Sequence, residues 1–257
     1  MAILKITKRT WLLIVVGVAA GLLSGLFGVG GGILIVPGLV MVAGLEQRVA
    51  HGTSLGAVLP IAVASLFTYW GNGHVDWPVA AFLALGAIFG SLIGTHLLAV
   101  TSKRALAYIF SSVLVISAIR LFISTHGSGR ATLTFAAVVA LVLVGLAAGA
   151  LAGLLGVGGG VVMVPAMIVL FSISPVIAKG TSIAVIIPTA MMGTWRNRAN
   201  GNLDLRAAAI VGFGGIAPAV LGGFIAAYMS DTVSNVLFAT LMLGIAARTI
   251  WQQRSTA

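Results

Sequence analysis

The sequence predicts an all-α polytopic membrane protein that forms a single membrane domain over residues 1–257. Three observations support this fold class. First, 60% of the 257 residues are hydrophobic and 7% are charged, whereas about a quarter of the residues of a water-soluble domain are charged. Second, most of the chain divides into apolar stretches of membrane-spanning size, without the alternating ten-residue segments of an outer-membrane barrel. Third, the chain contains an internal duplication.

The duplication has a fixed offset of 128 residues. GLFGVGGGILIVP at 25–37 returns as GLLGVGGGVVMVP at 153–165, with nine of thirteen positions identical. Without any gap, the same offset pairs Gly-Thr-Ser at 52–54 with Gly-Thr-Ser at 180–182, and it also pairs Asp76 with Asp204. We therefore expect repeat one at 1–129 and repeat two at 130–257.

Each repeat is expected to contain about five helices. The first apolar segment is interpreted as a helix rather than a cleaved signal peptide, because its counterpart around Leu146–Gly149 lies inside the chain. The second segment of each repeat has only about 12 or 13 residues, whereas ~20 are needed to cross a ~30 Å hydrocarbon core. These two segments are predicted to be broken or incomplete spans. The ten segments lie at 11–27, 33–44, 51–70, 77–100, 104–124, 132–155, 161–173, 179–197, 205–229 and 232–251.

The distribution of basic residues predicts how the repeats are oriented. The loop GNGHVD at 71–76 has no Lys or Arg, whereas its counterpart RNRANGNLDLR at 196–206 has three Arg. Cytoplasmic loops favour Lys and Arg, so equivalent loops of opposite bias indicate repeats of inverted topology. With five crossings per repeat, both termini are expected in the cytoplasm.

The remaining composition excludes several classes of function. The net charge of +10 arises from 14 basic and 4 acidic residues, and the positions of the basic residues at segment ends favour membrane orientation over nucleic-acid binding. The chain has no cysteine, which excludes disulfides and thiolate metal sites. Carboxylates fall at segment ends, and neither a metal cluster nor a nucleophile–base pair stands out. We therefore expect no enzyme activity, metal or cofactor.

The glycine blocks are the strongest candidates for function. Gly costs about 1 kcal/mol relative to Ala in a helix, so the blocks at 28–32 and 156–160 predict helix breaks. A helix that restarts after each block has unpartnered N–H groups and a positive dipole end, which bind anions without a charged side chain. Tight helix packing is the other interpretation of such glycines. The recurrence of the block before a short helix favours an anion site.

Polar residues near the blocks extend this hypothesis. Thr53, Ser54, Thr181 and Ser182 offer hydroxyl donors, although hydroxyls in membrane helices also bond carbonyls of their own helix. His51 and Lys179 occupy equivalent positions and either attract anions at the two mouths or end their helices at the interface. For Arg196 and Arg198 the alternatives are an anion vestibule and the cytoplasmic charge bias.

The paired GVGGGxxxVP blocks, each followed by a Gly-Thr-Ser element, resemble the TauE/SafE family of bacterial membrane permeases over essentially the whole chain. The named members of that family are sulfite and sulfoacetate exporters. The resemblance implies transport of a small organic or inorganic sulfur anion across the inner membrane by alternating access, with a homo-oligomer left open. A passive anion channel and a non-transporting membrane enzyme or assembly protein remain alternatives. The residues expected to surround the substrate are Gly28, Gly30, Gly31, Gly32, Thr53, Ser54, Gly156, Gly158, Gly159, Gly160, Thr181 and Ser182.

Overall fold

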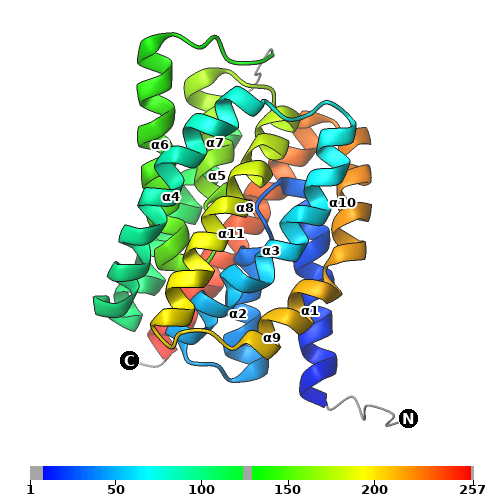
Figure 1. Cartoon of the computed structure of the whole chain (residues 1–257). Coiled ribbons are helices and arrows are strands. Elements are labelled where there is room, and N and C mark those ends of the chain that lie inside the picture. The colour runs from blue at the N-terminus through cyan, green and yellow to red at the C-terminus, as the bar shows by residue number, and fades with distance from the viewer. Residues whose placement is uncertain (1–7, 124–128, 256–257) are drawn as a thin grey trace.

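The computed structural model describes residues 8–123 and 129–255 of the chain (Figure 1). All regular secondary structure in these residues is helical, apart from one isolated bridge between Gly129 and Ile173, which confirms the predicted all-α class. The helices are α1 (Lys8–Phe27), α2 (Gly32–Ala43), α3 (Gln47–Gly71), α4 (Trp77–Val100), α5 (Lys103–Ile123), α6 (Phe135–Leu155), α7 (Gly160–Phe171), α8 (Pro175–Ala199), α9 (Leu205–Gly214), α10 (Ile216–Tyr228) and α11 (Asp231–Ser255).

The helices follow the predicted segments closely, with one difference. The segment predicted at 205–229 is divided into α9 and α10, which are bent by 42° at Gly215. Two consecutive glycines, Gly214 and Gly215, precede α10, and glycine-rich positions are common places for a helix to kink. The predicted segment is therefore present with a bend inside it, about which a hydropathy pattern carries no information.

Several helices are long and apolar enough to cross a membrane. By length and composition, α1, α3, α4, α6 and α8 qualify, and the bent pair α9–α10 qualifies when counted as one span. The short second helices are confirmed, because α2 and α7 have 12 residues each. Five crossings per repeat stays a prediction.

Equivalent aspartates begin equivalent helices. The Asp76 carboxylate accepts the amide of Val79 at 3.3 Å at the start of α4, and the Asp204 carboxylate accepts the amide of Ala207 at 2.9 Å at the start of α9. Such side-chain caps satisfy one of the free N–H groups of a helix start. The prediction that these carboxylates lie at segment ends is confirmed.

Glycine stripes allow two helix pairs to pack with their backbones in contact. A Cβ added at Gly21 of α1 would lie 2.8 Å from Gly215 Cα, and one added at Gly149 of α6 would lie 2.6 Å from Ala87 Cα of α4. Positions 21 and 149 differ by 128, and so do positions 87 and 215. The two contacts are therefore reciprocal: α1 of repeat one packs on repeat two as α6 of repeat two packs on repeat one.

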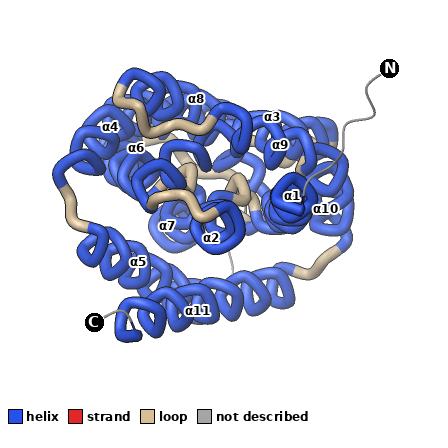
Figure 2. Tube along the Cα trace, turned by 90° about the horizontal axis from the view of Figure 1, so that it is seen from below, coloured by secondary structure: helices blue, strands red, loops and turns tan. Residues whose placement is uncertain are grey.

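The helices are arranged around the two short ones. Figure 2 shows α2 and α7 in the middle, with α5 and α11 side by side along one edge and α3 and α8 on the other side. The edge pair is joined to the centre through Phe27 at the end of α1, whose ring stacks on Phe238 of α11 with centroids 5.0 Å apart. The longer helices thus surround α2, α7 and the chain segments that precede them.

Equivalent parts of the two halves lie at opposite ends of the molecule in Figure 1. The chain enters α1 at the lower end and α6 at the upper end. The α3–α4 loop is at the top, where Arg130 donates to the Gly73 carbonyl at 3.2 Å, whereas the α8–α9 loop is at the bottom, where Arg9 and Asp204 form an ion pair at 3.6 Å.

Candidate functional site

The two glycine blocks interrupt the helices where the sequence predicts. Break one comprises residues 28–31 between α1 and α2, and break two comprises residues 156–159 between α6 and α7. Gly28, Gly30 and Gly31 have φ of 71°, 72° and 74°, and their counterparts in break two have φ of 67°, 82° and 81°. Because L-residues with a side chain rarely adopt such angles, only glycine fits these positions without strain.

The two breaks pack against each other in the core. A Cβ at Gly32 would lie 2.6 Å from Val157 Cα of break two, and a Cβ at Gly160 would lie 2.8 Å from Val29 Cα of break one. All residues of both breaks are buried. The starts of α2 and α7 therefore meet at one place, which contains the glycines that the sequence singles out.

Each break is tied by a serine of the other repeat. Ser54 on α3 donates to the Gly156 carbonyl at 2.7 Å, and Ser182 on α8 donates to the Gly28 carbonyl at 2.6 Å. Both hydroxyls are fully buried. Neither serine bonds a carbonyl of its own helix; each bonds a carbonyl of the other repeat.

The adjacent threonines hold the other repeat at a different point. Thr53 Oγ1 accepts the backbone amide of Asp204 at 2.9 Å, and Thr181 Oγ1 accepts the backbone amide of Asp76 at 2.9 Å. The threonines thus position the loops that lead into α9 and α4. In this arrangement they are second to the serines as candidates for contact with a ligand.

His51 and Lys179 lie beside the breaks rather than at surface mouths, since each side chain is only 2% exposed. A Cβ at Gly156 would lie 2.7 Å from His51 Cα, and one at Gly28 would lie 2.6 Å from Lys179 Cα. His51 Nδ1 is 2.5 Å from the Leu155 carbonyl oxygen, and Lys179 Nζ donates to Ser234 Oγ. The expectation that these two residues attract anions at the mouths is corrected here. Both lie on the buried second turn of a long helix, because α3 and α8 each begin four residues before the predicted segments at 51 and 179.

The other predicted basic residues lie apart from the breaks. Arg196 and Arg198 are exposed in the last turn of α8, where a cation complements the negative end of the helix dipole.

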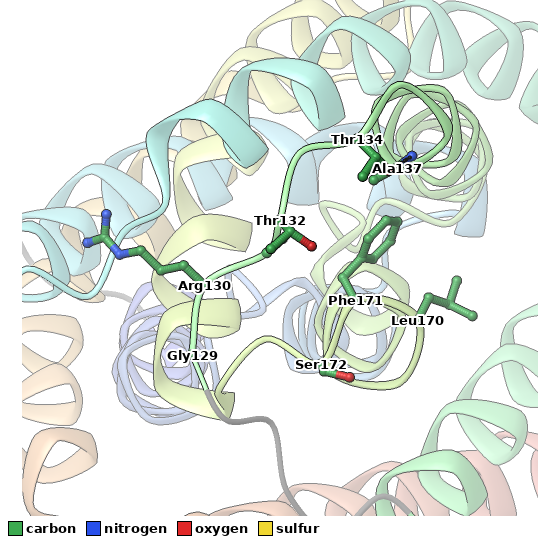
Figure 3. A pocket seen from close by; sticks show the side chains of 9 residues that line it. Gly129, Arg130, Thr132, Thr134, Ala137, Leu170, Phe171 and Ser172 are labelled. Atoms are coloured by element: carbon green, nitrogen blue, oxygen red, sulfur yellow. Dashed lines mark hydrogen bonds between the residues drawn. The ribbon is translucent and has the colours of Figure 1, made fainter.

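A hollow with a cationic side chain occurs at another place. Its volume is about 370 Å³, and Figure 3 shows it between the segment that leads into α6 and the end of α7, with Thr132 and Ser172 on its wall and the Arg130 side chain at its edge, extending toward the α3–α4 loop. Arg130 is exposed there. This hollow is near the upper end in Figure 1 and does not include any residue of the two breaks.

The chemistry of the central site comes from its backbone. The first amides of α2 that bond within the helix are those of Leu34 and Ile35, both to the Gly31 carbonyl, and in α7 they are those of Val162 and Met163, both to the Gly159 carbonyl. The amides at positions 32, 33, 160 and 161 precede these bonds and lie at the positive ends of the two helix dipoles. Such an arrangement suits a small anion.

Sequence reasoning missed two residues of this centre, Val58 and Ile186. A Cβ at Gly30 would lie 2.9 Å from Val58 Cγ1 and 3.3 Å from Ile186 Cγ2, and a Cβ at Gly158 would lie 3.6 Å and 3.3 Å from the same two atoms. Each side chain thus touches both breaks. Apolar residues in an apolar helix give no signal of their own, but the offset of 128 between positions 58 and 186 could have identified them as a pair.

Comparisons with known proteins agree with these features. The chain matches the family model described as Sulfite exporter TauE/SafE over residues 3–121 and 141–257. It is 29% identical over 248 residues to a probable membrane transporter protein of Xylella fastidiosa, with 92% of each chain covered. It is 28% identical over 218 residues to the probable membrane transporter protein YunE of Bacillus subtilis, covering 75% of this chain and 80% of the relative.

A plant relative shares a shorter region. The Sulfite exporter TauE/SafE family protein 1 of Arabidopsis thaliana is 33% identical over 117 residues, which cover 44% of this chain and 26% of the plant protein. No solved structure matches the chain.

Proposed function

Because the chain belongs to the Sulfite exporter TauE/SafE family and is a multi-pass membrane transporter, we propose that it exports small organosulfur anions such as sulfite or sulfoacetate. The proposed binding site is the place where break one meets break two. The observation that carries this proposal is the contact of the α2 and α7 starts, with Gly32 against Val157 and Gly160 against Val29.

The amides at the starts of α2 and α7 are the proposed ligands. A sulfonate or sulfite has several oxygens that accept hydrogen bonds, and two helix starts supply donors from two directions. The hydroxyls of Ser54 and Ser182 lie at the same breaks, where they now donate to Gly156 and Gly28. We propose that the hydroxyls turn to the anion when the breaks move apart.

The transport cycle is proposed to be alternating access. Breaks that touch through backbone atoms leave no space for an anion between them, so the two halves must separate for binding. Equivalent helices that start at opposite ends of the molecule (Figure 1) support inverted repeats, which open a shared central site first to one side and then to the other.

The orientation is proposed from charge. Arg9, Arg196, Arg198 and Arg206 belong to the end of the molecule where α1 begins and the α8–α9 loop lies, and cytoplasmic ends favour such residues. We therefore propose that the protein lies in the inner membrane with both termini in the cytoplasm. An inside-negative potential then drives an anion outward by about 2.3 kcal/mol per charge per 100 mV.

A flux experiment tests the proposal. The purified protein is reconstituted in liposomes loaded with radiolabelled sulfite, and efflux is followed with and without an imposed potential. Saturable, protein-dependent efflux that sulfoacetate and thiosulfate inhibit, and that acetate does not, is expected. Absence of protein-dependent efflux for all of these anions overturns the proposed function.

The same experiment distinguishes the nearest alternative, a passive anion channel. A carrier with alternating access saturates and exchanges external for internal anion, whereas a channel gives flux that rises linearly with concentration. Saturation together with exchange supports the carrier, and linear flux without exchange overturns it.

A further inference from the structure

His51 offers one nitrogen that the structure leaves without a partner. Its Nδ1 lies 2.5 Å from the Leu155 carbonyl oxygen, and since a carbonyl only accepts hydrogen bonds, Nδ1 carries a proton. In the neutral ring Nε2 is then an acceptor. Nε2 is buried and has no hydrogen-bond partner, although buried polar atoms nearly always have one.

The location of this nitrogen is next to the proposed anion site. Leu155 is the last residue of α6, directly before break two, and the His51 backbone packs on Gly156. Ser54, one turn further along α3, donates to the Gly156 carbonyl. His51 therefore belongs to the same group of contacts that holds break two.

The equivalent position in the other half carries a different chemistry. Lys179 packs on Gly28 of break one as His51 packs on Gly156 of break two, and its ammonium donates to Ser234 Oγ. An ammonium group thus accompanies break one. The imidazole beside break two supplies a comparable charge only after it takes up a proton.

We propose that Nε2 of His51 is a proton-binding site that couples proton movement to anion transport. This inference rests on the proposed function and names its coupling ion. A charge in a buried place is unfavourable unless an opposite charge accompanies it, so the proton and the anion stabilise each other at break two. The proton enters from the water on the side where the anion binds, adds to Nε2, and leaves to the water on the side where the anion is released.

Few other titratable groups are placed to take this role. The elements α6, α2 and the residues of break two, which pack around this part of α3, have no titratable side chain in their sequence. On α3 itself Arg48 precedes His51 by one turn and donates to the Thr101 carbonyl at 3.4 Å. The other elements packed on α3 contribute Lys8 and Arg9 from α1, Lys179, Arg196 and Arg198 from α8, Asp204 and Arg206 at the start of α9, and Tyr228 at the end of α10.

The experiment measures anion efflux in the presence of a pH gradient. Liposomes containing the full-length protein are loaded with radiolabelled sulfoacetate, whose charge is constant near neutral pH, and the membrane potential is clamped at zero. With the interior one pH unit more acidic than the exterior, the wild-type initial efflux rate is expected to rise, by up to about tenfold for one coupled proton. A wild-type rate that ignores the gradient overturns the inference.

Two variants locate the effect. His51→Gln keeps an amide donor for the Leu155 carbonyl but takes up no proton, and its efflux is expected to lose the dependence on the pH gradient. His96→Gln changes an exposed histidine on α4 and is expected to keep the wild-type dependence. A His51→Gln variant with the wild-type dependence overturns the inference while the proposed function stands, whereas wild-type protein without saturable efflux overturns both.

A second measurement does not depend on how well the variant folds. Sulfoacetate is added to wild-type protein in weakly buffered detergent solution, and proton uptake is recorded together with anion binding. Uptake of up to one proton for each bound anion is expected near neutral pH, and it should decrease at higher pH as the anion-bound protein loses that proton. Anion binding with no proton uptake at any pH overturns the inference.

Discussion

Break one and break two have the same backbone but different neighbours. Their glycines share positive φ angles within about ten degrees of each other, and their carbonyls accept equivalent serines at 2.6 Å and 2.7 Å. We call these shared glycines and serine bonds the common frame. Lys179 lies beside it at break one, and His51 lies beside it at break two. The two repeats thus share the glycine backbone and serine bonds of the breaks, and they differ in the titratable side chain beside each break.

A second difference lies at the far ends of α3 and α8. Tyr69 of α3 donates to the Gly25 carbonyl of α1 at 2.7 Å, whereas its counterpart Asn197 donates to Gly193 of its own helix at 2.9 Å. Repeat one therefore has a bond between α3 and α1 that repeat two lacks at the equivalent place within the described residues. Two halves with the same frame are expected to contribute unequally to stability and to anion binding.

The largest effect is expected from breaking the common frame. In Gly28→Ala the residue must keep a φ of 71°, and its new Cβ lies 2.6 Å from Lys179 Cα. Backbone strain of about 1–2 kcal/mol therefore adds to overpacking of about 1–3 kcal/mol. We expect transport to fall below a tenth of the wild-type rate and the melting temperature to fall, as measured by flux and thermal unfolding in detergent.

Gly73→Ala is the matched control. Gly73 has φ of 70°, but a Cβ there meets no atom within 4 Å. It should show the strain without the overpacking and keep most of the transport. Equal losses in both variants would mean that positive φ alone, and not contact between the repeats, makes Gly28 necessary.

The next effect concerns the charged neighbour of break one. Lys179→Gln removes the ammonium but keeps a donor for Ser234, and we expect the KM for sulfoacetate to rise about tenfold, equivalent to about 1.4 kcal/mol of anion binding. Saturation curves from proteoliposomes measure this change. An unchanged KM would show that the charge beside break one does not contribute to anion binding.

Variants of Ser54 and Ser182 test whether the two equivalent serine bonds contribute equally to stability. Ser54→Ala and Ser182→Ala each leave a buried carbonyl without its hydroxyl, at a cost of about 1–3 kcal/mol. We expect similar decreases in thermal stability for the two variants, because the bonds are reciprocal. A clear decrease in only one of them would contradict the symmetry of the frame.

The smallest effect is expected at the exposed end of α8. Arg196→Gln and Arg198→Gln remove charges that lie in water-exposed positions away from both breaks, and screened surface charges contribute little. We expect less than about a twofold change in flux at physiological salt. A larger change in KM would support the anion vestibule that the sequence left open.

Much of the fold could be predicted because the duplication constrains it twice. Apolar length and turn residues located the helices, and the glycine blocks located the breaks, since glycine in a helix is unfavourable. The bend at Gly215 was not predictable from hydropathy, because its counterpart Ala87 lies in the continuous helix α4. The backbone contacts that individual glycines make with the other repeat were not predictable either, because they depend on how the two repeats pack.

The site was predicted less completely than the fold. Glycines and serines that the sequence pairs do meet at the centre, but the threonines hold loops, and His51 and Lys179 are buried. The sequence suggests that the two residues lie at mouths because a helix end is difficult to locate from a polar residue alone: α3 begins at Gln47 and α8 at Pro175. Val58 and Ile186 give no chemical signal, so only contacts reveal them.

The most direct test of the central claim uses the absence of native cysteine from the chain. Single variants Val58→Cys and Ile186→Cys place a thiol at the meeting point of the breaks, and Arg198→Cys, at the exposed end of α8, is the control. Each protein is labelled with a membrane-impermeant maleimide from either side of the membrane, with and without sulfoacetate. The account predicts that both central thiols react from both sides and that sulfoacetate slows their labelling but not that of the control. Labelling of the central thiols that sulfoacetate leaves unchanged, or that occurs from one side only, would contradict an alternating anion site at the two breaks.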